Sequence, residues 1–364
     1  MEYRFDFGAG EAEAGYTKVP AGTAYDKALG YGFEGGIVNE RDRGGPDKLR
    51  GSFCIPVNAS FLVDLPDGNY TVTVTMGDQI APTTTTLKAG PNRMILHEAA
   101  ASAGQFLVRS FTTNVNTGQL KLSFSGIAPR VNAVTIRPAP QATTIFLAGD
   151  STVTDQETFP YAGWGQMLPL YLNAEVAVVN EAKSGRSSKS FLNEGRLQPI
   201  LDRIKPKDFL FIQFGHNDEK TDEERATDPF TTYKQYLNVY IKEARERGAI
   251  PVLITPVQRR KFGADGKIID THGDYVTAMK ELAAEENVPL IDLTASSTAL
   301  YESMGDEPSK ALFMWAYPGE FAAFPEGAKD DTHFQELGGI RIAGLVKDGI
   351  KELGLMPLCV YLRD

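Results

Sequence analysis

A serine, a histidine and an aspartate occupy segments whose residue types could carry out nucleophilic catalysis. Ser151 stands in AGDST, and His333, one of only four histidines in the chain, stands in KDDTHF. A serine hydroxyl attacks at neutral pH only when an adjacent base accepts its proton. Asp330 lies three residues before His333, so one helical turn would bring its carboxylate to one ring nitrogen and leave the other for Ser151.

Each of these residues also has a structural interpretation. Ser151 could cap a strand-to-helix turn, which is the stronger interpretation for an isolated Gly-Asp-Ser. Val153 stands where a G-x-S-x-G nucleophile elbow has its second glycine, which argues against an ordinary α/β-hydrolase. His333 could equally lie in the first turn of the last helix, with Asp331 at the cap of that helix.

Two further segments could supply donors to the oxyanion of a tetrahedral intermediate. Asn217 in FGHND has a side-chain amide, and the backbone N–H groups of Ser151 and of Gly185 in KSGRSS could add two more. Fixed donors aimed at an oxyanion usually make a large contribution to catalysis, and glycine permits close approach. The alternative for the segment around Asn217 is a polar turn, and we interpret His216 as a supporting or structural residue rather than a base.

The elements that would position these residues begin after residue 140. Short apolar strands are indicated at 144–149, 174–180, 208–215, 250–256 and 288–293, and amphipathic helices at 230–248 and 275–287. This alternation predicts an α/β domain with a parallel sheet covered on both faces. Active groups in such sheets gather at the carboxyl ends of the strands, where Ser151 and Asn217 stand.

The first part of the chain shows a different pattern. Short stretches of alternating apolar residues at 70–78, 119–126 and 131–138 are separated by Gly, Pro, Asn and Asp, which predicts an antiparallel β-sandwich. The proline-containing segment 137–144 is typical of a linker, because proline cannot continue a strand ladder. We therefore expect a β-sandwich domain at 1–140 and an α/β domain at 141–364.

The composition argues against several classes of partner. The formal net charge is −10 and the pI is about 5.1, so we expect neither nucleic acid nor an anionic membrane as a partner. Two cysteines are too few for a disulfide framework. The histidines at 97, 216, 272 and 333 lack the spacing of metal ligands, so we expect no metal and no cofactor.

The N-terminal residues MEYRFDFGAGEAEAG lack the basic region and apolar stretch of a signal peptide. The sequence contains no run of about 18 apolar residues, so we expect no transmembrane helix. We therefore expect a cytoplasmic protein as the sequence is written, and a secreted one if a signal peptide has been removed.

The four segments together resemble the blocks of the SGNH (GDSL) hydrolase superfamily. Ser151, Gly185, Asn217 and His333 follow the family's order, with Asp330 at the D-x-x-H position, over about residues 143–355. The resemblance implies a three-layer α/β/α fold and ester hydrolysis through a Ser–His–Asp triad and an acyl-enzyme. It also implies an oxyanion hole formed by Ser151, Gly185 and Asn217.

The stretches LAGDSTVTD, YAGWGQML, NEAKSGRSSKSF, FIQFGHNDEK, TPVQRRKF and THGDY are similar to rhamnogalacturonan acetylesterases, a branch of carbohydrate esterases. The similarity implies removal of acetyl groups from pectic poly- or oligosaccharides. FDFGAGEAEAGYTKV and GYGFEGG resemble the galactose-binding-like module that precedes the esterase domain in bacterial two-domain members. Two alternatives stay open: an SGNH lipase or thioesterase acting on other acyl esters, and a catalytically inactive carbohydrate-binding protein.

Three residues are candidate substrate contacts. Arg259 and Arg260 follow a strand end, and an arginine fork suits the carboxylate of a galacturonate, with a solvated basic turn as an equal alternative. Trp315, like Trp164 and Tyr317, could offer a flat apolar face to a sugar ring, although core packing is the stronger interpretation for Trp164. The sequence leaves the oligomeric state open.

Overall fold

The computed structural model describes residues 2–363, which form two compact units. The first unit contains residues 2–142, the segment Leu172–Ala177 and Arg363. The second unit contains Thr143–Tyr171 and Val178–Leu362. The residues that the sequence singles out as candidates for catalysis all lie in the second unit.

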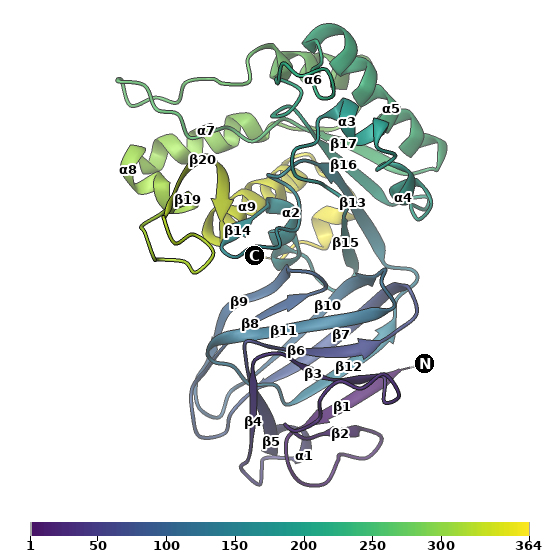
Figure 1. Cartoon of the computed structure of the whole chain (residues 1–364). Helices are drawn as coiled ribbons and strands as arrows, with labels where there is room; N and C mark the ends of the chain where they lie inside the picture. The colour runs from purple at the N-terminus through teal and green to yellow at the C-terminus, as the bar shows by residue number, and fades with distance from the viewer. Residues whose placement is uncertain (1, 364) are drawn as a thin grey trace. The chain divides into compact units, whose positions relative to one another are not determined.

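The first unit consists almost entirely of β-strands (Figure 1). One sheet has the order β10-β7-β12-β1-β2, formed by β10 (Phe106–Val115), β7 (Gly68–Gly77), β12 (Ala133–Pro138), β1 (Tyr3–Phe7) and β2 (Thr17–Val19). The second sheet has the order β3-β6-β11-β8-β9, formed by β3 (Tyr31–Glu34), β6 (Ala59–Asp64), β11 (Gln119–Ala128), β8 (Thr83–Ala89) and β9 (Arg93–Ala101). A ribbon pairs β4 (Ile37–Asp42) with β5 (Ser52–Val57), and one helical turn, α1 (Lys48–Gly51), precedes β5.

The two five-stranded sheets of the first unit pair their strands antiparallel, except that β1 and β2 run parallel. Side chains alternate between the two faces of a strand, so each sheet turns one apolar face into a shared core. In that core the ring of Phe61 meets Phe5 and Phe7 edge-on, at centroid distances of 5.1 and 4.9 Å. The antiparallel β-sandwich predicted for this part of the chain is confirmed.

The second unit is built around a five-stranded sheet with the order β15-β13-β16-β17-β18. Its strands are β15 (Val176–Asn180), β13 (Thr143–Gly149), β16 (Phe209–Gln213), β17 (Ile250–Ile254) and β18 (Leu290–Ile291). The pairs β13–β16, β16–β17 and β17–β18 are parallel. The parallel sheet predicted from the apolar strands is confirmed. β13 begins one residue earlier than predicted, and the other four strands are shorter than their predicted ranges.

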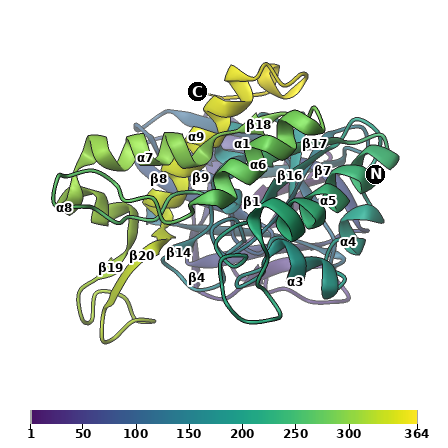
Figure 2. The ribbon, with the colours of Figure 1, turned by 90° about the horizontal axis from the view of Figure 1, so that it is seen from above.

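Helices cover both faces of this sheet (Figures 1 and 2). One face carries α3 (Ser188–Asn193), α4 (Gln198–Leu201), α5 (Lys234–Glu246) and α6 (Asp274–Glu285), and the other carries α2 (Trp164–Met167), α7 (Leu293–Met304) and α9 (Glu336–Glu352). Phe146 of β13 packs in the core beneath α5 with Leu237. Leu147, the next residue, points to the opposite face, where a Cβ on Gly165 of α2 would lie 2.5 Å from its Cδ1 atom.

A three-stranded antiparallel sheet stands beside the parallel one and has the order β14-β20-β19. Its strands are β14 (Tyr161–Ala162), β20 (Ala328–Gln335) and β19 (Phe313–Ala316), and β19 is preceded by the short helix α8 (Asp306–Ser309). The segment around His333 was expected in the first turn of the last helix, and that expectation is wrong. Residues 328–335 are strand because they pair with β19 and β14, and α9 begins only at Glu336.

The described residues, 2–363, include no helix that is both long enough and apolar enough to cross a bilayer. The longest helix near the candidate site, α9, is amphipathic, with Ile342 and Val346 buried and Arg341 exposed. The helix predicted at 230–248 begins with a π-helical turn at Pro229–Tyr233 before the regular α5.

Candidate active site

Ser151, His333 and Asp330 form a continuous line of close contacts. The Oγ atom of Ser151 lies 2.8 Å from Nε2 of His333, across 182 residues of sequence. The Nδ1 atom of the same ring lies 2.8 Å from Oδ2 of Asp330. With a proton on Nδ1, the ring donates to the carboxylate and presents an acceptor nitrogen to the serine hydroxyl.

An irregularity in β20 brings Asp330 and His333 to the same side. In a regular strand, residues three apart point to opposite faces. Here Phe334 pairs with Phe313 but Asp330 pairs with the very next residue, Met314, so three residues of β20 loop out against a single step of β19. Asp330 Oδ1 accepts hydrogen bonds from the backbone N–H groups of residues 332 and 333, at 2.8 and 3.0 Å. The carboxylate therefore closes an Asx-type turn, in place of the helical turn that we expected.

Asp330 is held as a carboxylate. Burial opposes the charge, but the hydrogen bond and the charge of His333, together with two backbone N–H groups, lower the pKa of Asp330 to about 2. The pair is therefore polarised at any ordinary pH, with a negative carboxylate next to Nδ1 of the ring.

Tyr161 supports this pair from β14, and the sequence reasoning did not single it out. Its hydroxyl donates to Asp330 Oδ2 at 3.4 Å, and its ring meets His333 edge-on with a centroid distance of 5.9 Å. Phe324 packs edge-on against the other side of the tyrosine ring at 5.3 Å. Tyr161 lies in the segment YAGWGQML, but nothing in its local spacing connects it to Asp330, which is 169 residues away.

A buried polar network holds the nucleophile loop, which we define as residues 149–154. Asp150 Oδ1 accepts from the backbone N–H and the hydroxyl of Thr152, at 2.9 and 2.8 Å. Thr152 Oγ1 in turn accepts from Gln213 Nε2 at 2.7 Å, and Gln213 Oε1 accepts from Trp164 Nε1 at 2.9 Å. All four side chains are buried, so this chain of bonds fixes the loop against β16 and α2. Trp164 is buried in the core, as we expected from the sequence, so its ring offers no face to a sugar.

The structure places Asn217 against the loop that contains Gly185. Asn217 Nδ2 donates to the carbonyl oxygen of Arg186 at 3.1 Å, and Arg225 donates to Asn217 Oδ1 at 3.4 Å. This arrangement leaves the second amide hydrogen of Asn217 available. Gly185 has φ = +80° with open space at its Cβ position, so glycine is required there by backbone conformation. Gly185 and Asn217, two of the three residues predicted for the oxyanion hole, thus lie in one neighbourhood.

His216 lies behind the site. Its ring is buried, with Nδ1 3.4 Å from Asp150 Oδ2, and packs edge-on against His272 at a centroid distance of 4.6 Å. Burial lowers the pKa of His216 against the opposing charge of Asp150, so the ring stays neutral. His216 therefore connects the segment before Ser151 with the segment before Asn217.

Two hollows include residues of this neighbourhood, Tyr161 in the first and Gly185 in the second. The first, about 420 Å³, is lined by Thr154, Asp155, Gln156, Glu157, Thr158, Tyr161, Lys183, Ser184, Ala323 and Phe324. The second, about 430 Å³, is lined by Gly185, Arg186, Ser190, Glu194, Asp222, Glu224 and Arg225. Polar and charged side chains dominate both walls, which suits a hydroxylated ligand better than a long acyl chain.

Both arginines predicted as carboxylate contacts are engaged inside the protein. Arg259 pairs with Glu219 at 3.0 Å. Arg260 is only 5% exposed and pairs with Asp306 at 2.9 Å and Asp331 at 3.1 Å. Because internal carboxylates occupy both guanidinium groups, neither arginine presents the open fork that we expected for a galacturonate.

Asp331 does not cap the last helix. The N-cap residue of α9 is Gln335, without a side-chain capping bond, and the carboxylate of Asp331 instead accepts from Trp315 Nε1 at 2.8 Å. The expected capping box fails because the residues at 330–333 belong to the irregular part of β20. Trp315 thereby lies against the far side of the segment that contains Asp330.

Two families match this chain. Residues 147–338, more than half of the 364, match the GDSL-like Lipase/Acylhydrolase family, and residues 3–123 match the Beta-agarase/YXIM esterase-like, galactose-binding domain-like family. The first match includes Ser151, Gly185, Asn217, Asp330 and His333.

Named relatives agree with these matches. Rhamnogalacturonan acetylesterase RhgT of Bacillus subtilis is 50% identical over 220 residues, which cover 60% of this chain and 93% of that protein. The uncharacterized esterase YxiM of the same organism is 32% identical over 374 residues, covering 97% of this chain and 91% of YxiM. The crystal structure of YxiM superposes with a TM-score of 0.54 at 29% identity, over 98% of this chain and 99% of that one. The chain belongs to the GDSL-like lipase/acylhydrolase family.

Proposed function

We propose that this chain is a serine O-acetylesterase that removes acetyl groups from rhamnogalacturonan. The observation that carries the proposal is the line of contacts from Ser151 through His333 to Asp330, with 2.8 Å at both steps. A hydroxyl touching a base that a carboxylate orients is the arrangement that activates a serine. The substrate is proposed from the 50% identity to a protein named rhamnogalacturonan acetylesterase.

In the proposed first step, Ser151 Oγ attacks the acetyl carbonyl carbon while His333 Nε2 accepts the hydroxyl proton. Asp330 keeps the ring proton on Nδ1 and stabilises the imidazolium that forms. The oxyanion accepts hydrogen bonds from the backbone N–H groups of Ser151 and Gly185 and from Asn217 Nδ2. His333 then donates its proton to the departing sugar oxygen, which leaves an acetyl group on Ser151.

In the second step, a water molecule attacks the acetyl-serine and His333 accepts a proton from that water. The same donors hold the second oxyanion. The bond to Ser151 Oγ breaks, the serine regains its proton from His333, and acetate leaves. Each step uses one proton carried by one ring nitrogen, so Asp330 need only hold the ring and never changes its own charge.

The polar walls beside the site favour an acetyl ester over the two alternatives. A lipase or thioesterase needs an apolar groove for a long acyl chain, and Asp155, Glu157 and Lys183 stand in the hollow next to Tyr161. An inactive carbohydrate-binding protein would not need the serine and histidine in hydrogen-bond contact, which they are at 2.8 Å.

Acetate release tests the proposal. Acetylated rhamnogalacturonan should be the better substrate when compared with acetylated xylan, and an acetyl ester should react faster than an octanoyl ester of the same alcohol. Ser151→Ala should lower kcat by at least about 10⁴-fold while its unfolding transition stays that of the wild type, because only the nucleophile is removed. Activity that persists in this variant, or preference for xylan or the octanoyl ester, would contradict the proposal.

A further inference from the structure

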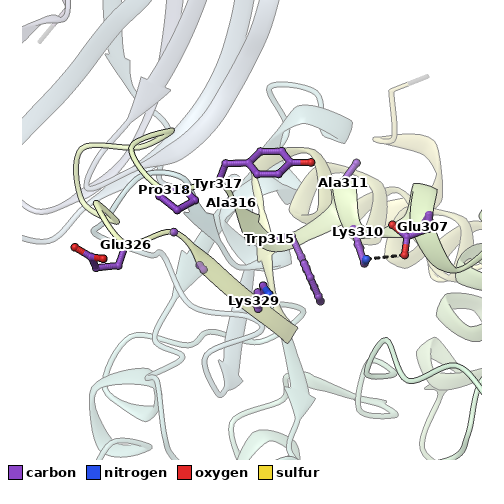
Figure 3. A pocket seen from close by; sticks show the side chains of 11 residues that line it. Glu307, Lys310, Ala311, Trp315, Ala316, Tyr317, Pro318, Glu326 and Lys329 are labelled. Atoms are coloured by element: carbon purple, nitrogen blue, oxygen red, sulfur yellow. Dashed lines mark hydrogen bonds and ion pairs between the residues drawn. The ribbon is translucent and has the colours of Figure 1, made fainter.

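A pocket of about 910 Å³ lies on the β19–β20 hairpin, apart from the two hollows that include Tyr161 and Gly185. The side chains of Trp315 and of Tyr317, which is 81% exposed, both line it, and Figure 3 shows Lys310 and Lys329 on either side of Trp315. Ala316 and Ala328, which face each other across the two strands, add small apolar side chains. None of the residues that line this pocket belongs to the proposed triad or oxyanion hole.

Three cationic side chains surround the indole ring of Trp315. Lys310 Nζ lies 4.3 Å from the ring centroid, the Arg260 guanidinium 5.3 Å and Lys329 Nζ 6.0 Å. Cations near an aromatic face are held by the ring's quadrupole without being neutralised. The ring therefore gathers positive charge at this pocket in a chain whose net charge is −10.

Only Lys329 of these three cations lacks a carboxylate partner among residues 2–363. Lys310 pairs with Glu307 at 2.7 Å, as the dashed line in Figure 3 marks, and Arg260 pairs with two aspartates. Lys329 is exposed, and Figure 3 shows the carboxylate of Glu326 at the far end of the pocket from Lys310. The ammonium group of Lys329 could thus pair with the carboxylate of a ligand without first giving up an internal ion pair.

The pocket shares a strand with the proposed triad. Lys329 immediately precedes Asp330 in β20, and the two side chains point to opposite faces of the strand. Trp315 donates to Asp331, the residue after Asp330. A ligand in the pocket therefore lies on the reverse face of the segment that holds the Asp330–His333 pair.

We propose that this pocket is a distal subsite that binds a carboxylate-bearing sugar of the substrate chain. The flat apolar face of a pyranose packs on Trp315, and the sugar carboxylate pairs with Lys329. A neutral sugar would use the ring but leave Lys329 without a partner. This subsite rests on the proposed function, and it takes over the role that the sequence had suggested for Arg259 and Arg260.

Binding tests the subsite without requiring turnover. Unacetylated rhamnogalacturonan oligosaccharides are titrated into the wild type and into Lys329→Met by calorimetry at low salt. The matched control is Lys242→Met, which removes an exposed lysine of α5 that forms no ion pair with any of residues 2–363. We expect Lys329→Met to raise Kd about three- to fivefold, the size of one exposed ion pair, and Lys242→Met to leave it unchanged. Added salt should remove the difference between Lys329→Met and the wild type.

A second ligand distinguishes the contribution of the Lys329 charge to binding from that of the Trp315 ring. For the same oligosaccharide with its carboxyl groups reduced to alcohols, Lys329→Met and the wild type should bind equally. Trp315→Leu should weaken both ligands, by about tenfold, and Trp315→Phe should weaken them less because a flat ring remains. The unfolding transition of Lys329→Met should match that of the wild type, which shows that the loss of binding does not come from unfolding.

The outcomes distinguish the two proposals. Equal Kd values for Lys329→Met and the wild type with the charged oligosaccharide overturn the subsite, whatever the enzyme hydrolyses. Absence of acetate release from acetylated rhamnogalacturonan by a wild type that still hydrolyses 4-nitrophenyl acetate overturns the proposed substrate. A charge-dependent loss of binding in Lys329→Met supports the subsite in either case.

Discussion

The nucleophile loop and the β19–β20 hairpin supply the two halves of the proposed triad, and they are held in different ways. Ser151 stands in a loop tied by buried hydrogen bonds among Asp150, Thr152 and Gln213. His333 stands in β20, and the two side chains that contact its ring, Asp330 and Tyr161, are only half-buried. A buried network specifies one position for the nucleophile, whereas the hairpin places the base and also offers exposed side chains to a ligand. Rigidity and recognition are therefore divided between the two regions.

The largest difference is expected between the two aspartates of the hairpin, Asp330 and Asp331. Asp330→Asn should lower kcat on the order of 10³- to 10⁴-fold, because an amide cannot hold Nδ1 as a hydrogen-bond donor in the same tautomer. Asp331→Asn, the matched control, removes the charge that pairs with Arg260 but keeps an acceptor oxygen for Trp315 Nε1, and it should change kcat a few-fold at most. Steady-state kinetics on an acetyl ester measures both. Equal losses would mean that the hairpin holds His333 through both carboxylates.

The next largest effect is expected at Asn217, which the sequence singled out as an oxyanion donor. Asn217→Ala should lower kcat on the order of 10²- to 10³-fold with KM nearly constant, because the lost hydrogen bond forms only in the transition state. An unfolding curve checks that the lost bonds to Arg186 and Arg225 have not displaced the loop. A change in KM alone would assign Asn217 to substrate binding.

Stability should separate the two regions more directly. Thr152→Val keeps the shape of the side chain but leaves the buried Nε2 of Gln213 without its acceptor and removes one of the two hydrogen bonds that Asp150 Oδ1 accepts, so the free energy of unfolding should fall by about 2–3 kcal/mol. Phe321→Ala, in the loop of the hairpin, removes one edge-on contact with Phe159 and should lower it by about 1 kcal/mol or less. Urea unfolding of both variants measures the difference. A larger loss for Phe321→Ala would reverse the comparison.

The last test concerns the charge of Asp330. Its pKa is lowered to about 2 from an ordinary value of 3.8, so its ionised form stabilises the folded state above about pH 4 by about 2 kcal/mol. This contribution is lost as the pH falls through the folded pKa. The difference in unfolding free energy between the wild type and Asp330→Asn should therefore shrink on acidification, measured by urea unfolding at successively lower pH. A difference that does not depend on pH would show that the carboxylate is not held by charge.

Much of the second unit could be predicted because the signals are local. An apolar run that ends in glycine and polar residues marks both a buried strand and its functional end, as at Ser151 and Asn217. The hairpin was predicted less well, since residues 328–335 carry Asp, Thr and His in an order that also suits a helix start. Pairing with β19 and β14 overrides that local preference.

The sequence by itself determined the five apolar strands of the parallel sheet, two of its helices and the blocks that contain Ser151, Asn217 and His333, because residue type and period act over a few neighbours. Only the tertiary structure decided which charges are already paired. The guanidinium groups of Arg259 and Arg260 meet carboxylates 40 and 46 residues away, and this leaves Lys329, beside Trp315, as the cation open to a ligand. Ion pairing depends on distance in space, and spacing along the chain carries no information about it.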